Sequence, residues 1–174
     1  GPVQPVCWAV LRDELRPDAQ TTLAYFEQQG VTVKVISGDN AQSAARVAQS
    51  AGIAGAQNFL DCAALPEEAD FGPYCEATAV FGRVSPRHKQ AIIRALQEKG
   101  HRAAMVGDGV NDVLALKQAD CSVAMAGGSD AAGQTAQLVL LDAQFSAMPH
   151  IVREGRRVIA NISRSASLFL VKNI

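Results

Sequence analysis

The sequence predicts an α/β protein with a Rossmann-like parallel β-sheet that is covered by helices on both faces. Short apolar and β-branched runs alternate with helical stretches along the 174 residues, and a Gly, Pro or Asp marks nearly every change. Strands that alternate with helices in this way form βαβ units, in which neighbouring strands are parallel. The chain is also 48% hydrophobic and 19% charged, which is sufficient to bury one ordinary core.

The first hundred residues contain three expected strands and three expected helices. Pro17 stands in the first turn of the first helix, where a proline fits because no backbone N–H is needed. Gly30, Gly52 and Gly100 end the three helices. The segment 54–75 is expected to be irregular, because it holds two prolines and an acidic cluster. The expected strands are 7–11, 31–36 and 77–81, and the expected helices are 16–29, 41–51 and 86–100.

The rest of the chain continues this alternation and then changes character. The expected strands are 102–106, 121–125 and 138–141, with helices at 111–118 and between the last two strands. The segment 145–174 instead reads as one long helix, whose basic side chains are accompanied by a single acid, Glu154. Its apolar end is shorter than a membrane span requires. The sequence therefore predicts a domain at 1–144 and a helical tail at 145–174.

Charge and cysteine content exclude several classes of protein. A formal net charge of -1 and an aromatic content of 5% do not favour a nucleic-acid-binding module, which needs basic patches and stacking platforms. The four cysteines are far apart and form no C-x-x-C pair, so neither a zinc site nor a small disulfide scaffold is predicted. We expect no nucleic-acid partner.

Three polar clusters follow expected strands, at the edge where open parallel sheets bind their ligands. They occupy 37–40, 83–89 and 107–112. Each alone is typical of a polar cap on the turn between a strand and a helix. Together they bring a hydroxyl, a lysine and a pair of aspartates to one edge, which indicates a functional site.

The side chains in these clusters suit Mg²⁺-dependent phosphoryl transfer. A phosphoryl group needs hydrogen-bond donors for its oxygens, a cation, and a hard metal held by carboxylates. Ser37 offers a hydroxyl, Gly38 lets backbone N–H groups approach a phosphate, and Lys89 supplies a positive charge. Asp108 stands between two glycines at a strand end, and Asp112 follows one helical turn later. These two aspartates are predicted to bind Mg²⁺.

Two neighbouring groups are expected to have no catalytic role. His88 stands beside Lys89, which already supplies the positive charge, so His88 is predicted to be a solvated helix residue. The acidic cluster of Glu67, Glu68 and Asp70 is predicted to form a solvated loop face and not a metal site.

The motifs in these clusters resemble those of the P-type ATPases, and they occur in that family's order. G-D-G-V-N-D at 107–112 is the most specific of them. S-G-D-N at 37–40 is similar to the family's T-G-D-N, with Ser in place of Thr, and 86–89 corresponds to its lysine segment. D-E-L-R at 13–16 stands where the family has D-P-P-R, without the two prolines. The resemblance covers essentially the whole chain and is greatest to a bacterial branch that includes calcium exporters.

The resemblance implies the haloacid-dehalogenase-like phosphorylation domain of an ATP-driven cation pump, with Mg²⁺ as cofactor and ATP as substrate. Lys89 would contact the aspartyl phosphate, and Asp108 would bind Mg²⁺ with support from Asp112. The residues implied to line the phosphate and nucleotide site are Ser37, Gly38, Asp39, Arg16, Asp13, Lys89 and Asn111. The catalytic set is then Lys89, Ser37, Asp108 and Asp112.

The resemblance also implies partners, because the family's D-K-T-G-T nucleophile motif does not occur in these 174 residues. The partners would be the nucleotide-binding, actuator and transmembrane domains of the same pump. The tail 145–174 would be the stalk helix that leads to the fifth transmembrane segment, at the cytoplasmic face of the cell membrane. The 174 residues alone are expected to be soluble and inactive.

Two other functions stay open at this stage. A soluble phosphatase of the same superfamily would carry its own D-x-D nucleophile motif, which does not occur here. A non-catalytic phosphate-binding module, such as a receiver domain, would need an acidic pair after the first strand and an acceptor Asp after the third. The residue after the first expected strand is Arg12, and the third is followed by Gly82 and Arg83.

Overall fold

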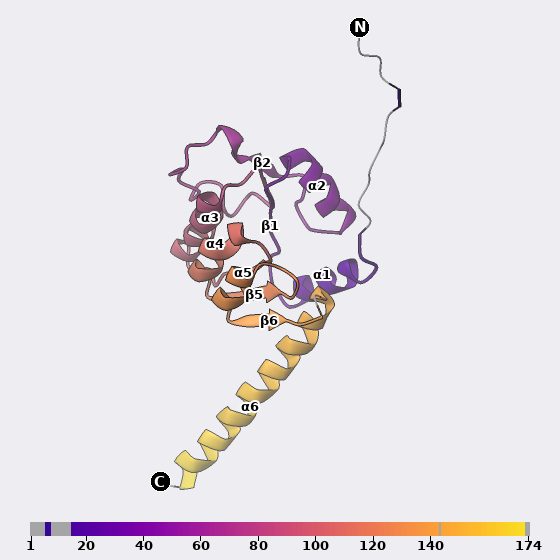
Figure 1. The fold of residues 1–174 in the computed structure, drawn as a ribbon. Coiled ribbons are helices and arrows are strands. Elements are labelled where there is room, and N and C mark those ends of the chain that lie inside the picture. Colours follow the sequence, from indigo (N-terminus) through magenta and orange to yellow (C-terminus); the bar gives the residue numbers. More distant parts are fainter. Residues whose placement is uncertain (1–5, 8–14, 143, 173–174) are drawn as a thin grey trace.

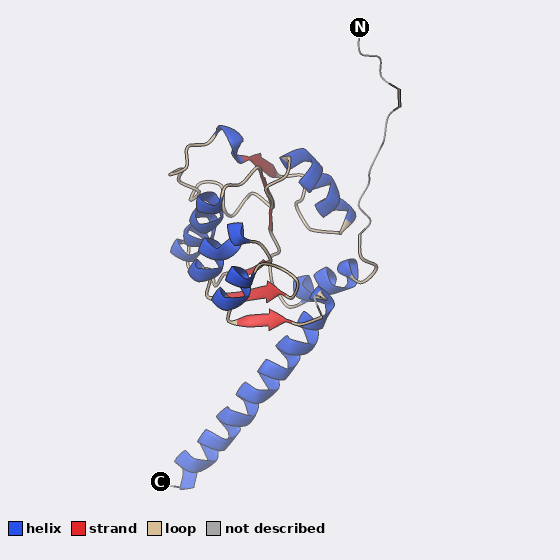
Figure 2. Cartoon of the chain, viewed as in Figure 1, coloured by secondary structure: helices blue, strands red, loops and turns tan. Residues whose placement is uncertain are grey.

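The computed structural model describes residues 6–7, 15–142 and 144–172 as an α/β body from which one long helix projects (Figure 1). Helices and strands alternate along the chain, as the sequence predicts (Figure 2). The helices are α1 (Ala19–Gln28), α2 (Ala41–Ser50), α3 (Pro86–Glu98), α4 (Val113–Gln118), α5 (Asp130–Thr135) and α6 (Met148–Lys172). The strands are β1 (Val35–Ile36), β2 (Phe59–Asp61), β3 (Val80–Gly82), β4 (Ala104–Gly107), β5 (Cys121–Met125) and β6 (Leu138–Leu140).

The strands form two three-stranded sheets, whereas the sequence predicts a single sheet. The first has the order β1-β3-β2 and the second the order β4-β5-β6, and all the described pairings are parallel. Within the described residues, β1 and β4 each pair with one strand, so each has an unpaired edge. Ile36 of β1 packs against the hydrophobic clusters of both sheets, so the two sheets share a boundary at β1.

Strand β3 is covered by a helix on each face because its side chains alternate. Val80 packs with Ala45 and Ala48 of α2, whereas Phe81 packs with Ile92 of α3. Successive side chains of a strand point to opposite faces of its sheet, so α2 and α3 lie on opposite sides. Val80 and Phe81 are both fully buried. The prediction of helices on both faces is thus confirmed at the first sheet.

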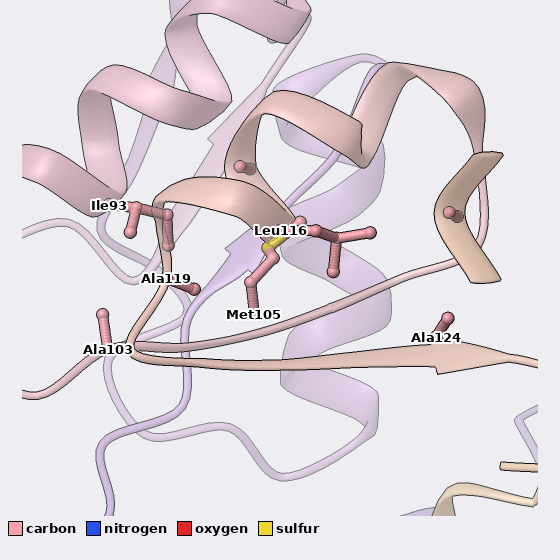
Figure 3. Close-up of a cluster of buried hydrophobic side chains, with 8 residues drawn as sticks. Ile93, Ala103, Met105, Leu116, Ala119 and Ala124 are labelled. Carbon is pink, nitrogen blue, oxygen red and sulfur yellow. The ribbon is translucent and has the colours of Figure 1, made fainter. Parts of the chain in front are cut away.

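Helix α3 also contributes to the core of the second sheet. Ile93 directly follows Ile92 and belongs to a cluster with Met105 of β4 and Leu116 of α4 (Figure 3). The same cluster contains several alanines, which let α4 and α5 approach the sheet closely. Because α3 packs into both cores, it joins the two sheets into one body.

Side-chain caps fix the residues at which α2 and α3 begin. Asn40 accepts hydrogen bonds from the backbone N–H groups of Gln42 and Ser43, at 3.0 and 3.2 Å. Ser85 accepts one from the N–H of His88 at 3.2 Å. Asn and Ser are strong N-caps because their side chains satisfy backbone N–H groups that have no partner inside the helix. Each cap therefore sets the end of the polar loop that precedes its helix.

The tail, expected to be one helix from residue 145, forms a short 3-10 turn at Phe145–Ala147 and then the 25-residue helix α6, and both contact the body at α1. The Phe145 ring lies 5.7 Å from the Phe26 ring between centroids, and the Arg156 guanidinium donates a hydrogen bond to the Gln29 side chain. Further along, the side chains of α6 are exposed as far as Phe169. None of the helices in the described ranges, α6 included, combines the length and apolar content needed to cross a membrane.

Two elements differ from the prediction, and a third lies outside the described residues. The expected strand 31–36 is regular only at its end, because the Val31 N–H bonds back to the Phe26 carbonyl at the end of α1 (3.0 Å). The segment 54–75 was expected to be irregular but contains β2. That strand is only three residues long, and Phe59 is 46% exposed, so it lacks the pattern of a buried strand. The expected strand 7–11 falls mostly on residues that the structure does not describe.

We expect Gly82→Ala to lower the free energy of unfolding by about 1–3 kcal/mol, because α2 leaves no space for a side chain there. A Cβ at residue 82 would lie 2.2 Å from the Cα of Ala41, so helix and strand would have to separate. Urea denaturation measures the difference. Gly133→Ala in α5 is the control, because a Cβ there meets nothing within 4 Å. Equal midpoints for the wild type and Gly82→Ala would contradict this packing.

Candidate functional site

The three predicted polar clusters follow β1, β3 and β4, at the carboxyl ends of these strands. Strands β1 and β3 are neighbours in the first sheet, and β4 is the edge strand of the second. Two kinds of contact connect the clusters. Backbone hydrogen bonds join the loop 37–40 to the turn 83–84, and an ion pair joins α3 to the turn 107–112. The site is therefore assembled from both sheets.

The loop after β1 is fastened to the turn after β3. The Ser37 N–H donates to the Phe81 carbonyl at 2.9 Å, which extends the pairing of the two strands. The Arg83 N–H then donates to the Asp39 carbonyl at 2.7 Å, and the Val84 N–H donates to the Ser37 carbonyl at 3.1 Å. Within the loop, the Ser37 hydroxyl accepts the Asp39 N–H and lies 3.1 Å from the Asp39 carboxylate. The hydroxyl is thus held at the sheet edge.

Lys89 and Asp112 form the most buried ion pair among the described residues. The Lys89 Nζ lies 2.7 Å from the Asp112 Oδ1, and the two side chains are only 12% and 9% exposed. Lys89 comes from the second turn of α3, and Asp112 from the short 3-10 turn Val110–Asp112 that precedes α4. A charge-assisted hydrogen bond of this length is strong when water is excluded. It fixes the Lys89 charge beside the turn after β4.

The second oxygen of Asp112 organises the glycine-rich turn. Its Oδ2 accepts hydrogen bonds from the N–H groups of Asp108 and Gly109, at 3.2 and 3.0 Å. Gly107 permits this arrangement, because a Cβ there would lie 2.6 Å from the Cβ of Asp112. Both Asp112 oxygens are therefore engaged with the protein, and their effect is to hold Asp108 in a defined backbone position.

Asp108 combines a fixed backbone with an available carboxylate. Its carbonyl accepts the Ser129 N–H at 2.7 Å, and Gly128 packs so closely that a Cβ there would lie 2.3 Å from the same carbonyl oxygen. The residue is exposed, and within the described chain its carboxylate accepts no hydrogen bond. Across residues 6–7, 15–142 and 144–172, no three His, Cys, Asp or Glu side chains form a group that could hold a metal. The donor set still fits Mg²⁺, which takes one or two carboxylates and fills its shell with water and phosphate oxygens.

The other predicted site residues occupy different places. Gly38 and Asn111 are exposed within the loops of the site. Arg16 is exposed just before α1, where its carbonyl accepts the Ala19 N–H at 3.0 Å. Asp13 lies outside the described residues.

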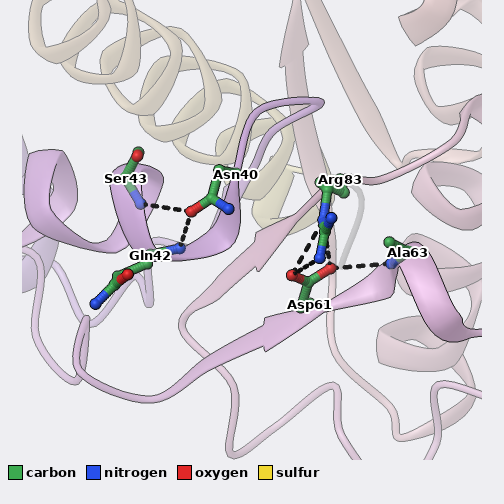
Figure 4. A network of polar contacts seen from close by, with 6 residues as sticks. All are labelled: Asn40, Gln42, Ser43, Asp61, Ala63 and Arg83. Atoms are coloured by element: carbon green, nitrogen blue, oxygen red, sulfur yellow. Dashed lines mark hydrogen bonds and ion pairs between the residues drawn. The ribbon is translucent and has the colours of Figure 1, made fainter.

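The prediction missed Asp61, which pairs with Arg83 through two hydrogen-bonding nitrogens (Figure 4). The Arg83 Nε donates to the Asp61 Oδ1 at 2.8 Å, and the Ala63 N–H donates to the same oxygen at 3.0 Å. The hydrogen bonds from Arg83 and then from Ala63 lower the pKa of the Asp61 carboxyl. Asp61 was missed because the sequence did not predict β2. Asp61 is the last residue of that strand, the position at which site residues were sought in the other strands.

The prediction that His88 is solvated is wrong. His88 is 3% exposed, its Nε2 lies 2.8 Å from the Pro66 carbonyl, and its ring packs edge-on against Phe71. The segment 62–75 covers this face of α3, which the sequence pattern of the helix alone does not reveal. His88 thus anchors that segment to the helix that carries Lys89.

Comparisons with known proteins agree with this geometry. A family model described as haloacid dehalogenase-like hydrolase matches residues 3–120. The chain is 52% identical to the calcium-transporting ATPase CtpE of Mycobacterium tuberculosis, over 100% of this chain and 22% of that protein. It is 45% identical to the probable cation-transporting ATPase exp7 of Streptococcus pneumoniae, over 99% of this chain and 22% of that protein. The chain thus spans about a fifth of the length of these relatives.

Solved structures give the same result. The chain is similar to a zinc-transporting PIB-type ATPase in its E2.Pi state, with a TM-score of 0.69, 27% identity, and coverage of 88% of this chain and 21% of that one. It is also similar to the catalytic domain of the CPx-ATPase CopB-B, with a TM-score of 0.61, 25% identity, and coverage of 79% and 45%. Because the family model matches well over half of its residues, the chain belongs to the haloacid dehalogenase-like hydrolases, and its relatives are the P-type cation-transporting ATPases.

Proposed function

We propose that the chain is part of the catalytic phosphorylation domain of an ATP-driven cation pump that works through an aspartyl phosphate. The observation that carries the proposal is the Lys89–Asp112 ion pair beside the exposed Asp108 carboxylate. Phosphoryl transfer depends on fixed charges and a metal ligand held at one point more than on a proton donor or acceptor. The names of the cation-transporting relatives support the same conclusion.

Each site residue has a role in holding a phosphoryl group. The Lys89 ammonium offsets the charge of the phosphoryl oxygens, and Asp112 keeps that ammonium in place. We assign the Ser37 hydroxyl a hydrogen bond to the same group, in place of the one that it donates to the Asp39 carboxylate at 3.1 Å. Gly38 has no side chain of its own to keep a phosphate from its N–H. We assign Asn111 a supporting contact to phosphate, and Asp39, Arg16 and Asp13 contacts to the nucleotide.

Asp108 is the proposed Mg²⁺ ligand. Bound there, Mg²⁺ would neutralise phosphate charge, which is the chemistry that this family requires of it. Asp112 supports the metal indirectly, since its Oδ2 positions the Asp108 backbone.

The unpaired edges of β1 and β4 support the proposal that another segment of the same protein pairs with them. Each edge presents backbone N–H and C=O groups that one more parallel strand could satisfy. Ile36 of β1 already shares a cluster with Met105 of β4, so the two edges belong to adjoining strands. We propose that a strand carrying the acceptor aspartate pairs here, with the nucleotide-binding, actuator and transmembrane domains completing the pump.

The proposed cargo is a cation, and the name of the 52% identical relative favours calcium. ATP is the proposed substrate. The domain would lie at the cytoplasmic face of the cell membrane, with α6 leading toward the transmembrane segments.

Mg²⁺ titration followed by NMR should shift the amides of 107–112 before any others, because Asp108 presents an available carboxylate. Asp108→Asn should remove most of this response. Asp130→Asn is the control, since Asp130 is an exposed aspartate at the first residue of α5. Shifts confined to Glu67, Glu68 and Asp70 would show that the metal site lies elsewhere.

Lys89→Gln should weaken the binding of inorganic phosphate at least tenfold, because a hydrogen bond to a charged group contributes about 1.5–3 kcal/mol. Calorimetric titration measures the change. Lys99→Gln is the control, since Lys99 lies at the other end of α3 with its side chain 46% exposed. If both variants bind phosphate as the wild type does, Lys89 does not hold phosphate.

The 174 residues alone should neither hydrolyse ATP nor become phosphorylated, because the site residues can hold a phosphate but supply no attacking carboxylate. A longer protein that adds the D-K-T-G-T segment and the nucleotide-binding domain should be labelled by radioactive ATP, and hydroxylamine should remove the label. Its turnover should stay slow until the actuator domain is added. Robust Mg²⁺-dependent turnover by the 174 residues, lost in Asp108→Ala, would instead indicate a stand-alone phosphatase.

A further inference from the structure

Arg83 adopts a backbone conformation that side chains rarely tolerate. Its φ is +50°, and it is the one residue other than glycine with a positive φ in the described part of the chain. In this region the Cβ of an L-residue crowds the backbone, so the conformation persists only where the surroundings impose it. Strain of this kind concentrates at functional sites. The contacts around Arg83 identify what imposes it.

The turn at Arg83 is what fastens the loop 37–39 to β3. Gly82 lies against Ala41 at the start of α2, where a Cβ on residue 82 would be 2.2 Å from the Ala41 Cα. The N–H groups of Arg83 and Val84 then donate to carbonyls within the loop, at 2.7 and 3.1 Å. The two hydrogen bonds lie on either side of Arg83, and the φ and ψ of Arg83 set the direction of the Val84 N–H relative to the Arg83 N–H.

Among the described residues, the Arg83 side chain hydrogen-bonds only to Asp61. The Arg83 Nε lies 2.8 Å from one oxygen of Asp61, and an Nη donates to the other, which is the bidentate geometry that arginine and carboxylate favour (Figure 4). Asp61 is itself fixed, because it lies opposite Gly82 in the β2–β3 ladder and accepts the Ala63 N–H. The Asp61 carboxylate therefore holds the Arg83 guanidinium from the rigid end of β2. This Asp61–Arg83 ion pair is called the clamp below.

We propose that Asp61 is a positioning residue for the phosphate site, acting through Arg83 to hold the loop that carries the Ser37 hydroxyl and the Gly38 N–H. The clamp keeps Arg83 in its left-handed turn, and the turn keeps the loop on the sheet edge. The proposal rests on the proposed function only for the identity of the ligand, phosphate. The structural part of the proposal, which is that the turn at Arg83 depends on Asp61, does not rest on the proposed function.

Because the Asp61–Arg83 pair is exposed to solvent, its role in positioning the loop can be distinguished from a role in global stability. The Arg83 and Asp61 side chains are 50% and 34% exposed, so water screens the pair and it adds little to global stability. Loss of the pair should therefore loosen the loop while the core remains intact. The hydrogen bonds from Arg83 lower the pKa of Asp61, so the pair persists at neutral pH. The pair breaks only when the pH falls below the ordinary aspartate pKa of about 4.

The first test is amide hydrogen exchange of the 174-residue chain without ligand. Asp61→Asn should speed exchange about tenfold at the amides of Arg83 and Val84, with an unchanged melting temperature. Asp70→Asn is the matched control, because Asp70 also accepts a backbone N–H two residues ahead in the same segment, from Gly72 at 2.8 Å. As the pH is lowered into the acidic range, the NMR chemical shift of the Arg83 amide should change in the wild type and not in Asp61→Asn. Unchanged exchange at both amides in Asp61→Asn would overturn the proposal.

The second test is a backbone rescue. Glycine adopts a positive φ without strain, so Arg83→Gly should make Asp61 dispensable. Adding Asp61→Asn to Arg83→Gly should change exchange at the amides of residues 83 and 84 less than twofold. If Asp61→Asn has its full effect in both backgrounds, Asp61 does not act through the Arg83 turn and the proposal is wrong.

The third test uses inorganic phosphate as the probe. Asp61→Asn should weaken phosphate binding about threefold to tenfold, and Asp70→Asn should leave it unchanged. Equal affinity of the wild type and Asp61→Asn would overturn the positioning role. A wild-type chain that binds no phosphate would instead count against the proposed function, while the exchange measurements would still decide whether Asp61 holds the turn.

Discussion

The close contact between Gly82 and the first residue of α2 sets the geometry on which the candidate site depends. A strand end without a side chain lets the helix lie against the sheet, so the loop that caps α2 and the turn that leaves β3 run side by side. Ser85 follows within three residues and starts α3, which carries Lys89. One tight approach of backbone to backbone thus sets the positions of the hydroxyl and the lysine together.

Electrostatics connects this first sheet to the second. Lys89 belongs to a helix packed on β3, and Asp112 belongs to the turn that follows β4, so their ion pair crosses from one sheet to the other. Burying two charges is unfavourable unless each finds partners, and here Asp112 accepts from Lys89 and from two backbone N–H groups. A carboxylate held by three donors resists rearrangement, which suits a site that must present its charge in one place.

The sequence predicted the helices well because their determinants are local. Asn40 and Ser85 cap α2 and α3 as their positions before apolar periodic runs suggest. Sheet pairing is not local: the division into two sheets depends on which strands exchange hydrogen bonds across the fold, and no short pattern encodes it. The burial of His88 depends on a covering segment distant from its helix face, and the Asp61–Arg83 pair joins residues 22 apart in sequence. For these reasons the sequence predicted that the three polar clusters lie at the carboxyl ends of strands, but not the residues that support them.

The length of α6 has a mechanical consequence. At a rise of 1.5 Å per residue, its 25 residues extend about 37 Å, yet the described side-chain contacts of this segment with the body lie at Phe145, just before α6, and at Arg156 in the N-terminal half of the helix. A rotation of about 10° at that base therefore displaces the far end by roughly 6 Å. Because the helix contacts the body at α1, a small rotation there would become a displacement of about one helical turn at its far end.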